Sequence, residues 1–182
     1  MKYYAFLRAI NVGGHTVKMD ALQRIFESLG FFHVSTFIAS GNLKFETPSI
    51  ESKLLEVKIE SALKSELGFD AATFVRTEEE LKDITHKEPF DSSLLKTAVS
   101  VQVAFLKESL QAEDQKKILS LRTPTDEFYV GGREIYWLVR TRQSESSFSN
   151  AILEKTLKTV STIRGIETLK KILLKTGTVC DA

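Results

Sequence analysis

Two short stretches near the start of the chain combine glycine with polar side chains. One runs from Arg8 to Gly14 and the other from Ser40 to Asn42. Glycine lets a backbone come close to a ligand, and successive N–H groups can surround an anion. A guanidinium such as that of Arg8 can donate paired hydrogen bonds to a carboxylate or a phosphate. The stretches therefore predict a binding site for an anionic group, with the candidate residues Arg8, Asn11, Gly13, Gly14, Ser40, Gly41 and Asn42.

Structural interpretations of the same residues stay open. Neither G-x-G-x-x-G nor G-x-x-x-x-G-K-[ST] occurs in the sequence, so neither nucleotide-binding motif applies. Gly13-Gly14 can form a tight corner, and the two asparagines can join the loops through hydrogen bonds to the backbone. Arg8 can pair with an acidic residue. Ser40-Gly41 separates two predicted strands, and its glycine suits the positive φ of a hairpin turn.

Catalytic chemistry has less support, because nucleophiles, bases and metal ligands do not cluster in the sequence. His15, His33 and His86 are isolated from one another, and no metal site is predicted. Ser40 lies outside a G-x-S-x-G motif, and Cys180 has no evident base nearby. His15 is the one candidate base within the predicted site. The sequence therefore leaves open whether the protein is an enzyme, and its cofactors are unknown.

Charge is spread unevenly along the chain, although the net charge is only +1. Residues 1–45 carry a net +3 and residues 133–175 a net +5, whereas residues 46–91 carry −6. The basic ends favour an anionic ligand, and they add the candidates Arg140, Arg142 and, above all, Arg164. Nucleic acid is not the expected partner, because the net charge is near neutral and the aromatic strand motif of RNA-recognition sheets does not occur.

Hydrophobic periodicity predicts one order of elements in both halves of the chain. In the first half we expect strands at 2–7, 32–38, 42–45 and 71–76, and helices at 19–29, 48–67 and from 78 onward. In the second half we expect strands at 99–106, 127–130 and 134–139, and helices at 112–121, 147–160 and 166–173. Residues 161–164 fit either a short strand or a helix cap.

Each half thus follows the order β-α-β-β-α-β-α, which contains the split βαβ pattern called ferredoxin-like. The predicted fold class is α+β, with two ferredoxin-like halves arranged as a structural duplication. The expected domains are residues 1–90 and residues 91–182, the second with an extra C-terminal helix.

This topology would bring the two glycine-bearing stretches together. In a split βαβ unit, the end of the first strand and the tip of the hairpin between the second and third strands lie at the same edge. We call the surface formed by the Arg8–Gly14 loop and the Ser40–Asn42 hairpin the rim.

The same residues carry a resemblance to a known family. The run Leu7-Arg-Ala-Ile-Asn-Val-Gly-Gly14, then Met19 and Leu22, then Val34 to Asn42 and Phe45, resembles the mainly bacterial family called domain of unknown function 1697. Members typically show R-G-I-N-V-G-G, M-x-x-L and T-Y-I-x-S-G-N-x-x-F at this spacing. Here Ala9 stands where the family usually has glycine, and Arg164-Gly165-Ile166 stands where it often has R-N-W. The resemblance implies a two-part α+β fold and no particular reaction.

The sequence also gives expectations about location and function. No apolar run approaches the ~18 residues of a membrane span, the start of the chain does not resemble a signal peptide, and Cys180 is the only cysteine. We therefore expect a cytoplasmic protein without membrane contact. The expected function is binding of a small anionic ligand at the rim. The alternatives are an enzyme acting on a phosphorylated or nucleotide substrate there, and an interaction module for nucleic acid or protein.

Overall fold

The computed structural model describes residues 1–10, 16–37 and 41–175. Contacts divide the chain into two compact units, Met1–Lys82 and Asp83–Ala182, and the division falls within one helix. The domain boundary after residue 90, which the sequence suggested, stays a prediction. Each unit is described by itself below.

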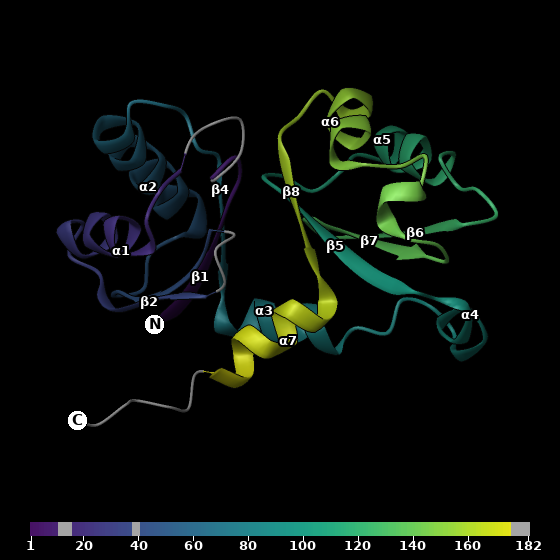
Figure 1. Ribbon diagram of the computed structural model, residues 1–182, viewed down its shortest axis with the longest axis horizontal. Helices are drawn as coiled ribbons and strands as arrows, with labels where there is room; N and C mark the ends of the chain where they lie inside the picture. The colour runs from purple at the N-terminus through teal and green to yellow at the C-terminus, as the bar shows by residue number, and fades with distance from the viewer. Residues whose placement is uncertain (11–15, 38–40, 176–182) are drawn as a thin grey trace. The chain divides into compact units, whose positions relative to one another are not determined.

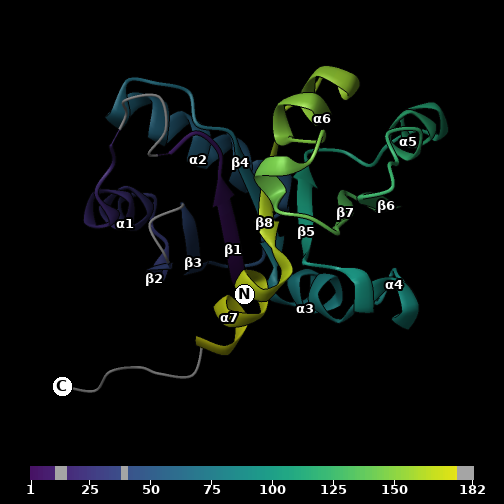
Figure 2. The same ribbon diagram turned by 45° about the vertical axis from the view of Figure 1, so that its right-hand side comes forward.

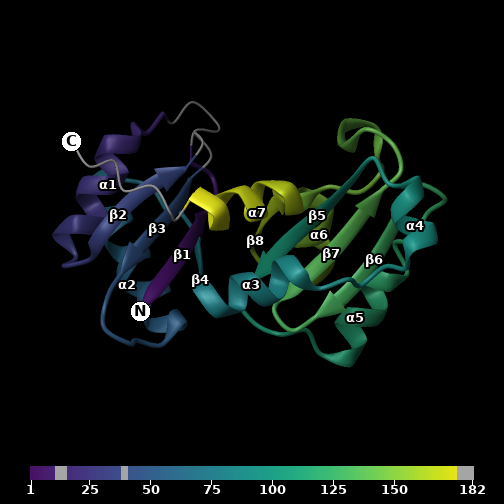
Figure 3. The same ribbon diagram turned by 90° about the horizontal axis from the view of Figure 1, so that it is seen from below.

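The first unit is built around a four-stranded antiparallel sheet with the strand order β2-β3-β1-β4 (Figures 1 and 3). Along the chain its elements are β1 (Lys2–Leu7), α1 (Met19–Ser28), β2 (Phe32–Phe37), β3 (Asn42–Glu46), α2 (Ser52–Leu67), β4 (Thr73–Thr77) and the start of α3 (Glu78–His86). Both β1 and β2 run antiparallel to β3. This is the split βαβ arrangement that the sequence predicted.

The core of the first unit lies between one face of this sheet and the helices α1 and α2. Alternate side chains of β1, namely Tyr3, Ala5 and Leu7, join this core because successive strand residues point to opposite faces. Phe31 and Phe45 stack there with ring centroids 4.5 Å apart. The two helices therefore cover a single face of the sheet.

The second unit repeats this plan with the strand order β6-β7-β5-β8. After the end of α3, its elements are α4 (Ser92–Thr97), β5 (Ser100–Leu106), α5 (Ala112–Leu119), β6 (Asp126–Gly131), β7 (Glu134–Val139), the 3₁₀ turn Gln143–Glu145, α6 (Asn150–Leu157), β8 (Ser161–Gly165) and α7 (Ile166–Leu174). Figure 2 shows α5 and α6 on one side of these strands and α4 on the other. The predicted α+β fold with two similar halves is confirmed.

Strand registers align the two units residue by residue. In the first unit Ala5 pairs with Val75, and in the second Ala104 pairs with Ile163. One position further along the fourth strand, Arg76 and Arg164 occupy equivalent places, opposite Tyr4 and Val103. The duplication inferred from element order therefore extends to matching positions.

Some predicted element boundaries were wrong, for local reasons. The second helix begins at Ser52 and not at Thr47-Pro48, because the backbone N–H of Thr47 donates to the carbonyl of Met1 over 3.1 Å and extends the sheet ladder. The helix expected at 147–160 covers only Asn150–Leu157, with Ser149 as its N-cap. Helix α4 was not predicted; Asp91 caps it by accepting a hydrogen bond from the N–H of Leu94 at 2.9 Å.

Other local predictions are confirmed. Thr77 and Glu80 form the capping box that starts α3: each backbone N–H donates to the other side chain, at 2.8 and 3.1 Å. Residues 161–164 belong to a strand, β8. Among the described residues, no helix combines the length and the apolar character needed to cross a membrane.

Candidate functional site

The end of β1 and the hairpin between β2 and β3 meet in the structure. The backbone N–H of Leu7 donates to the carbonyl of Gly41 over 2.8 Å, and Phe6 pairs with Asn42 in the sheet register. The topological argument for the rim is therefore correct for these described residues. It places the end of β1, which precedes Arg8, directly beside Gly41.

Gly41 has a backbone conformation that favours glycine. Its φ is +71°, as expected from the turn, and a Cβ at this position would lie 3.0 Å from the Cβ of Leu7 and 3.4 Å from that of Ile10. Because of the positive φ and the close approach, a larger side chain at this position would lower the stability of the fold. Gly41 therefore lets the hairpin pack against the end of β1.

Arg8 is anchored by its backbone at the same edge of the sheet. Its N–H donates to the carbonyl of Ala72 over 2.8 Å, so the segment that precedes β4 also reaches this edge. The next residue, Ala9, has a φ of +63°, a conformation in which glycine is more stable than alanine. The sequence pointed to Ala9 only through its departure from the family pattern, and Ala72 was missed because it lies far from Arg8 along the chain.

Asn42 serves the structure of the hairpin. Its side chain is buried, and its amide nitrogen donates to the carbonyl of Phe37 over 3.2 Å. This bond joins the two strands of the hairpin, which is the structural interpretation left open for the asparagines. The other rim candidates, Asn11, Gly13, Gly14 and Ser40, lie outside the described residues, as does His15, and their roles stay predictions.

Arg164 belongs to the second unit, where it bonds along its own strand. Its Nη1 donates to the hydroxyl of Thr162 at 2.7 Å and to the carbonyl of Ile163 at 2.9 Å. Burial lowers the pKa of this guanidinium to about 10, so it remains charged at neutral pH. Arg76, at the equivalent position, likewise donates from Nη1 to the carbonyl of Val75 at 2.8 Å. The recurrence shows a structural role for both arginines, and a role of Arg164 at the rim stays a prediction.

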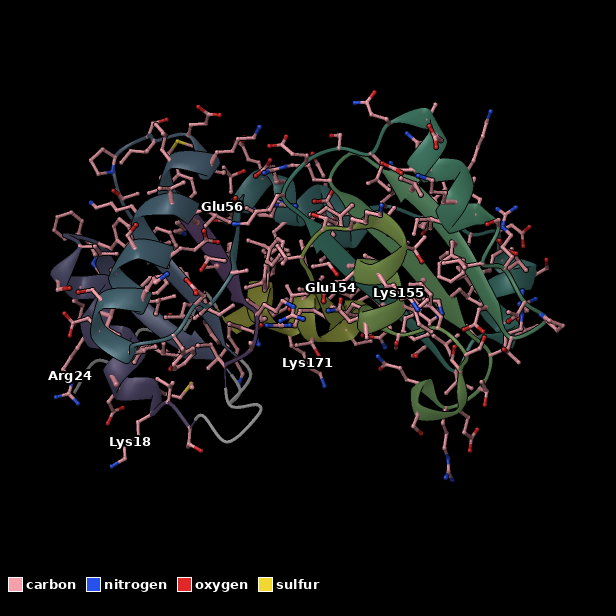
Figure 4. The ribbon with its side chains drawn as sticks, turned by 90° about the horizontal axis from the view of Figure 1, so that it is seen from above. Lys18, Arg24, Glu56, Glu154, Lys155 and Lys171 are labelled. Carbon is pink, nitrogen blue, oxygen red and sulfur yellow. The ribbon has the colours of Figure 1, made fainter. Side chains whose placement is uncertain are left out.

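Glutamate carboxylates accept hydrogen bonds from backbone N–H groups of the two edge strands that carry these arginines, β4 and β8. In β4, the N–H groups of Thr73 and Val75 donate to Glu60 and Glu56 at 2.7 and 2.8 Å. In β8, the N–H of Ser161 donates to Glu154 at 2.8 Å. Figure 4 shows Glu56 on α2 and Glu154 on α6. A charged acceptor satisfies an N–H that an edge strand would otherwise expose, so these glutamates stabilise and protect the edges.

Asp126 is the most deeply buried of the described carboxylates in the second unit, and the sequence did not single it out. Its oxygens accept hydrogen bonds from the hydroxyls of Thr123, Thr125 and Ser146, and from the indole N–H of Trp137. Burial alone would raise the pKa of Asp126, but these four donors together hold it below its ordinary value. The cluster links β6, β7 and the turn before α6, and its role is structural.

No group of three or more histidine, cysteine, aspartate or glutamate side chains that could hold a metal ion occurs within the described ranges. At the described part of the rim the backbone N–H groups of Leu7 and Arg8 bond within the sheet, and the guanidinium of Arg8 is the group whose type suits the recognition of an anion.

Comparisons with known proteins place the fold and the family. A solved structure of a conserved bacterial protein, SP0830 from Streptococcus pneumoniae, superposes with a TM-score of 0.75 at 24% sequence identity, covering 97% of this chain and 98% of that one. At this identity the likeness shows the fold alone. No curated protein matches the chain. The family model described as "Protein of unknown function (DUF1697)" matches residues 1–136, so this chain belongs to that family.

Proposed function

We propose that this protein binds a small molecule bearing a phosphate or a carboxylate at the rim. The observation that carries the proposal is the 2.8 Å hydrogen bond from the N–H of Leu7 to the carbonyl of Gly41. This bond joins the residue immediately before Arg8 to Gly41, the residue that follows Ser40 in the sequence. Two segments with anion-binding residue types thus belong to one edge of one sheet.

The chemistry of the neighbouring elements supports an anionic ligand. The segment after Arg8 carries Gly13-Gly14, whose N–H groups can approach a ligand closely. Helix α1 begins at Met19, a few residues beyond this segment, and Lys18 at its N-cap makes no side-chain capping bond. The positive end of a helix dipole favours negative charge, and the ammonium of Lys18 adds to it.

Calorimetric titration with inorganic phosphate, a nucleoside monophosphate and citrate tests the proposal. We expect at least one of these anions to bind the parent protein, and Arg8→Ala to weaken that binding about tenfold or more, because a charged hydrogen bond contributes ~1.5–3 kcal/mol. Arg8→Lys should give an intermediate affinity, because it keeps the charge and loses the paired donors.

Arg24→Ala is the matched control. Arg24 lies on α1 of the same unit, is exposed and extends outward (Figure 4). The control should bind as the parent does. Thermal unfolding of each variant shows that it is folded. Failure of all three anions to bind the parent, or equal affinities for the parent and a folded Arg8→Ala variant, would rule the proposal out.

We further infer that binding takes place in the cytoplasm. A single cysteine in 182 residues fits a reducing compartment, where a free thiol is stable. Fluorescence microscopy of a tagged chain, combined with fractionation, tests this location; recovery in an oxidising compartment would contradict it.

A further inference from the structure

A cavity of about 370 Å³ lies within the second unit, on the face of its sheet opposite α5 and α6. This volume falls at the small end of the range of ligand sites. Val101 of β5 and Tyr136 of β7 line it from the sheet. Leu95 of α4, Ile166 of α7 and Phe90, which precedes α4, also line it. The interior is therefore mostly apolar and aromatic.

The cavity exists because short elements cover this face incompletely. Helix α4 has six residues, none of them buried, and its Leu95 remains 41% exposed. Helix α7 contacts β5 and β8 (Figure 3), and the end of α3 reaches β7, where Ile84 accepts a hydrogen bond from Tyr136. The cavity remains between these elements and the sheet residues Val101 and Tyr136.

The walls of the cavity are held in place without a ligand. The hydroxyl of Tyr136 donates to the carbonyl of Ile84 over 3.2 Å and ties the end of α3 to the sheet. Burial raises the pKa of this hydroxyl, so it stays protonated and keeps donating. A preformed wall reduces the ordering cost of binding.

Charged side chains of both signs surround this apolar interior: Lys87, Glu88, Glu167 and Lys170. Glu167 and Lys170 neutralise each other across 2.9 Å. The ammonium of Lys87 lies 5.2 Å from the ring centroid of Tyr129, and no carboxylate of the described residues pairs with it. Lys87 and Glu88, which are consecutive and exposed, thus add one positive and one negative residue to the lining of the cavity.

We propose that this cavity binds a small zwitterion with an apolar body, that is, an α-amino acid with a large aromatic or branched side chain. Lys87 is the partner for its carboxylate and Glu88 the partner for its ammonium. The side chain fills the space between Phe90, Val101 and Ile166. A molecule with a single charge would pair with only one of Lys87 and Glu88. Its charged group would then lie close to the other residue, which carries the same sign of charge.

Calorimetry with two apolar amino acids, L-phenylalanine and L-leucine, and with three partial analogues tests the class of ligand. L-Phenylalanine has both charges and an apolar body, 3-phenylpropanoate has no ammonium, 2-phenylethylamine has no carboxylate, and glycine has no apolar body. We expect L-phenylalanine or L-leucine to bind, each singly charged analogue to bind at least about tenfold more weakly, and glycine not to bind. Equal binding of one singly charged analogue, or no binding of either apolar amino acid, would overturn the proposal.

Variants then locate the site. Lys87→Met should weaken amino-acid binding about tenfold or more, and Leu95→Asp should abolish it with little effect on folding, because Leu95 is partly exposed. Lys96→Met, an exposed lysine of α4 outside the cavity, should bind as the parent does. Methyl NMR shifts on titration should be confined to Val101, Leu95 and Ile166. Shifts confined to the first unit would place the binding elsewhere and would refute the proposal.

This site is independent of the rim. Arg8→Ala should leave amino-acid binding unchanged, and Lys87→Met should leave phosphate binding unchanged. Either proposal can therefore fail while the other stands.

Discussion

Trp137 donates its indole N–H to the buried carboxylate of Asp126 across 2.8 Å. The bond joins β7 to the start of β6, at a position where the ring of Trp137 also packs edge-to-face on Phe148, with centroids 4.8 Å apart. A carboxylate is thus kept ionised within an aromatic core by neutral donors, since three hydroxyls and one indole N–H donate to Asp126.

Replacing this carboxylate should destabilise the second unit. Asp126→Asn exchanges an acceptor-only group for one that also donates, so at least one of the four donors loses its partner. We expect a loss of about 1–3 kcal/mol in the free energy of unfolding at pH 7, measured by urea denaturation. Asp70→Asn, which removes an exposed carboxylate paired with Lys64, should change it by less than about 0.5 kcal/mol.

Asp126 should also make stability depend on pH in the acid range. Its pKa is lower in the folded protein than in the unfolded chain, where it is about 3.9. The carboxylate therefore contributes stability above pH ~4, and this contribution is lost as the pH falls toward the folded-state pKa. Between pH 5 and pH 2, the free energy of unfolding should fall more steeply for the parent than for Asp126→Asn. An equal fall in both proteins would show that Asp126 makes no such contribution.

Gly41 should tolerate no larger residue without loss of stability. Gly41→Val combines a positive φ with a Cβ only 3.0 Å from the Cβ of Leu7, so we expect a loss of about 1–3 kcal/mol in chemical denaturation. Gly30→Val is the control: Gly30 has a φ of +81°, but a Cβ there meets nothing within 4 Å. A loss at Gly41 no greater than that at Gly30 would show that the close approach to Leu7 is unimportant.

Ala9 should be improved by the residue that the family usually has. Its φ of +63° costs an L-residue about 1–2 kcal/mol, whereas the extra freedom of glycine in the unfolded chain costs about 0.4–1 kcal/mol. Ala9→Gly should therefore raise the free energy of unfolding by up to about 1 kcal/mol. Ala5→Gly, within the regular strand β1, should lower it. Destabilisation by Ala9→Gly would contradict the positive φ at this position.

The carboxylates at the two strand edges should act in their own units. Glu60→Ala should accelerate amide hydrogen exchange at Thr73, and Glu154→Ala should accelerate it at Ser161, because each N–H loses its acceptor. Neither variant should affect the amide in the other unit. Exchange at Ser161 that is the same in Glu154→Ala and the parent would show that this bond does not form in solution.

The sequence by itself determined the order of the elements and the duplication, because apolar periodicity is a local property that the chain carries everywhere. The capping box of Thr77 and Glu80 and the turn glycine Gly41 were predictable for the same reason: each depends on residues within a few positions. Topology then followed from the element order, and it placed Gly41 beside Leu7.

Only the tertiary structure decided which polar residues serve the fold. Asn42 and Arg164 were candidate ligand contacts in the sequence, and the structure adds that their amide and guanidinium groups bond to Phe37 and to Thr162 and Ile163. The cluster around Asp126 and the cavity beside Tyr136 were not predicted, because each brings together residues well separated in the sequence, such as Asp126 with Ser146 and Tyr136 with Ile84. Hydrogen bonds and cavities depend on distances in space between such residues, and those distances exist only once the sheets have formed and the helices have packed on them.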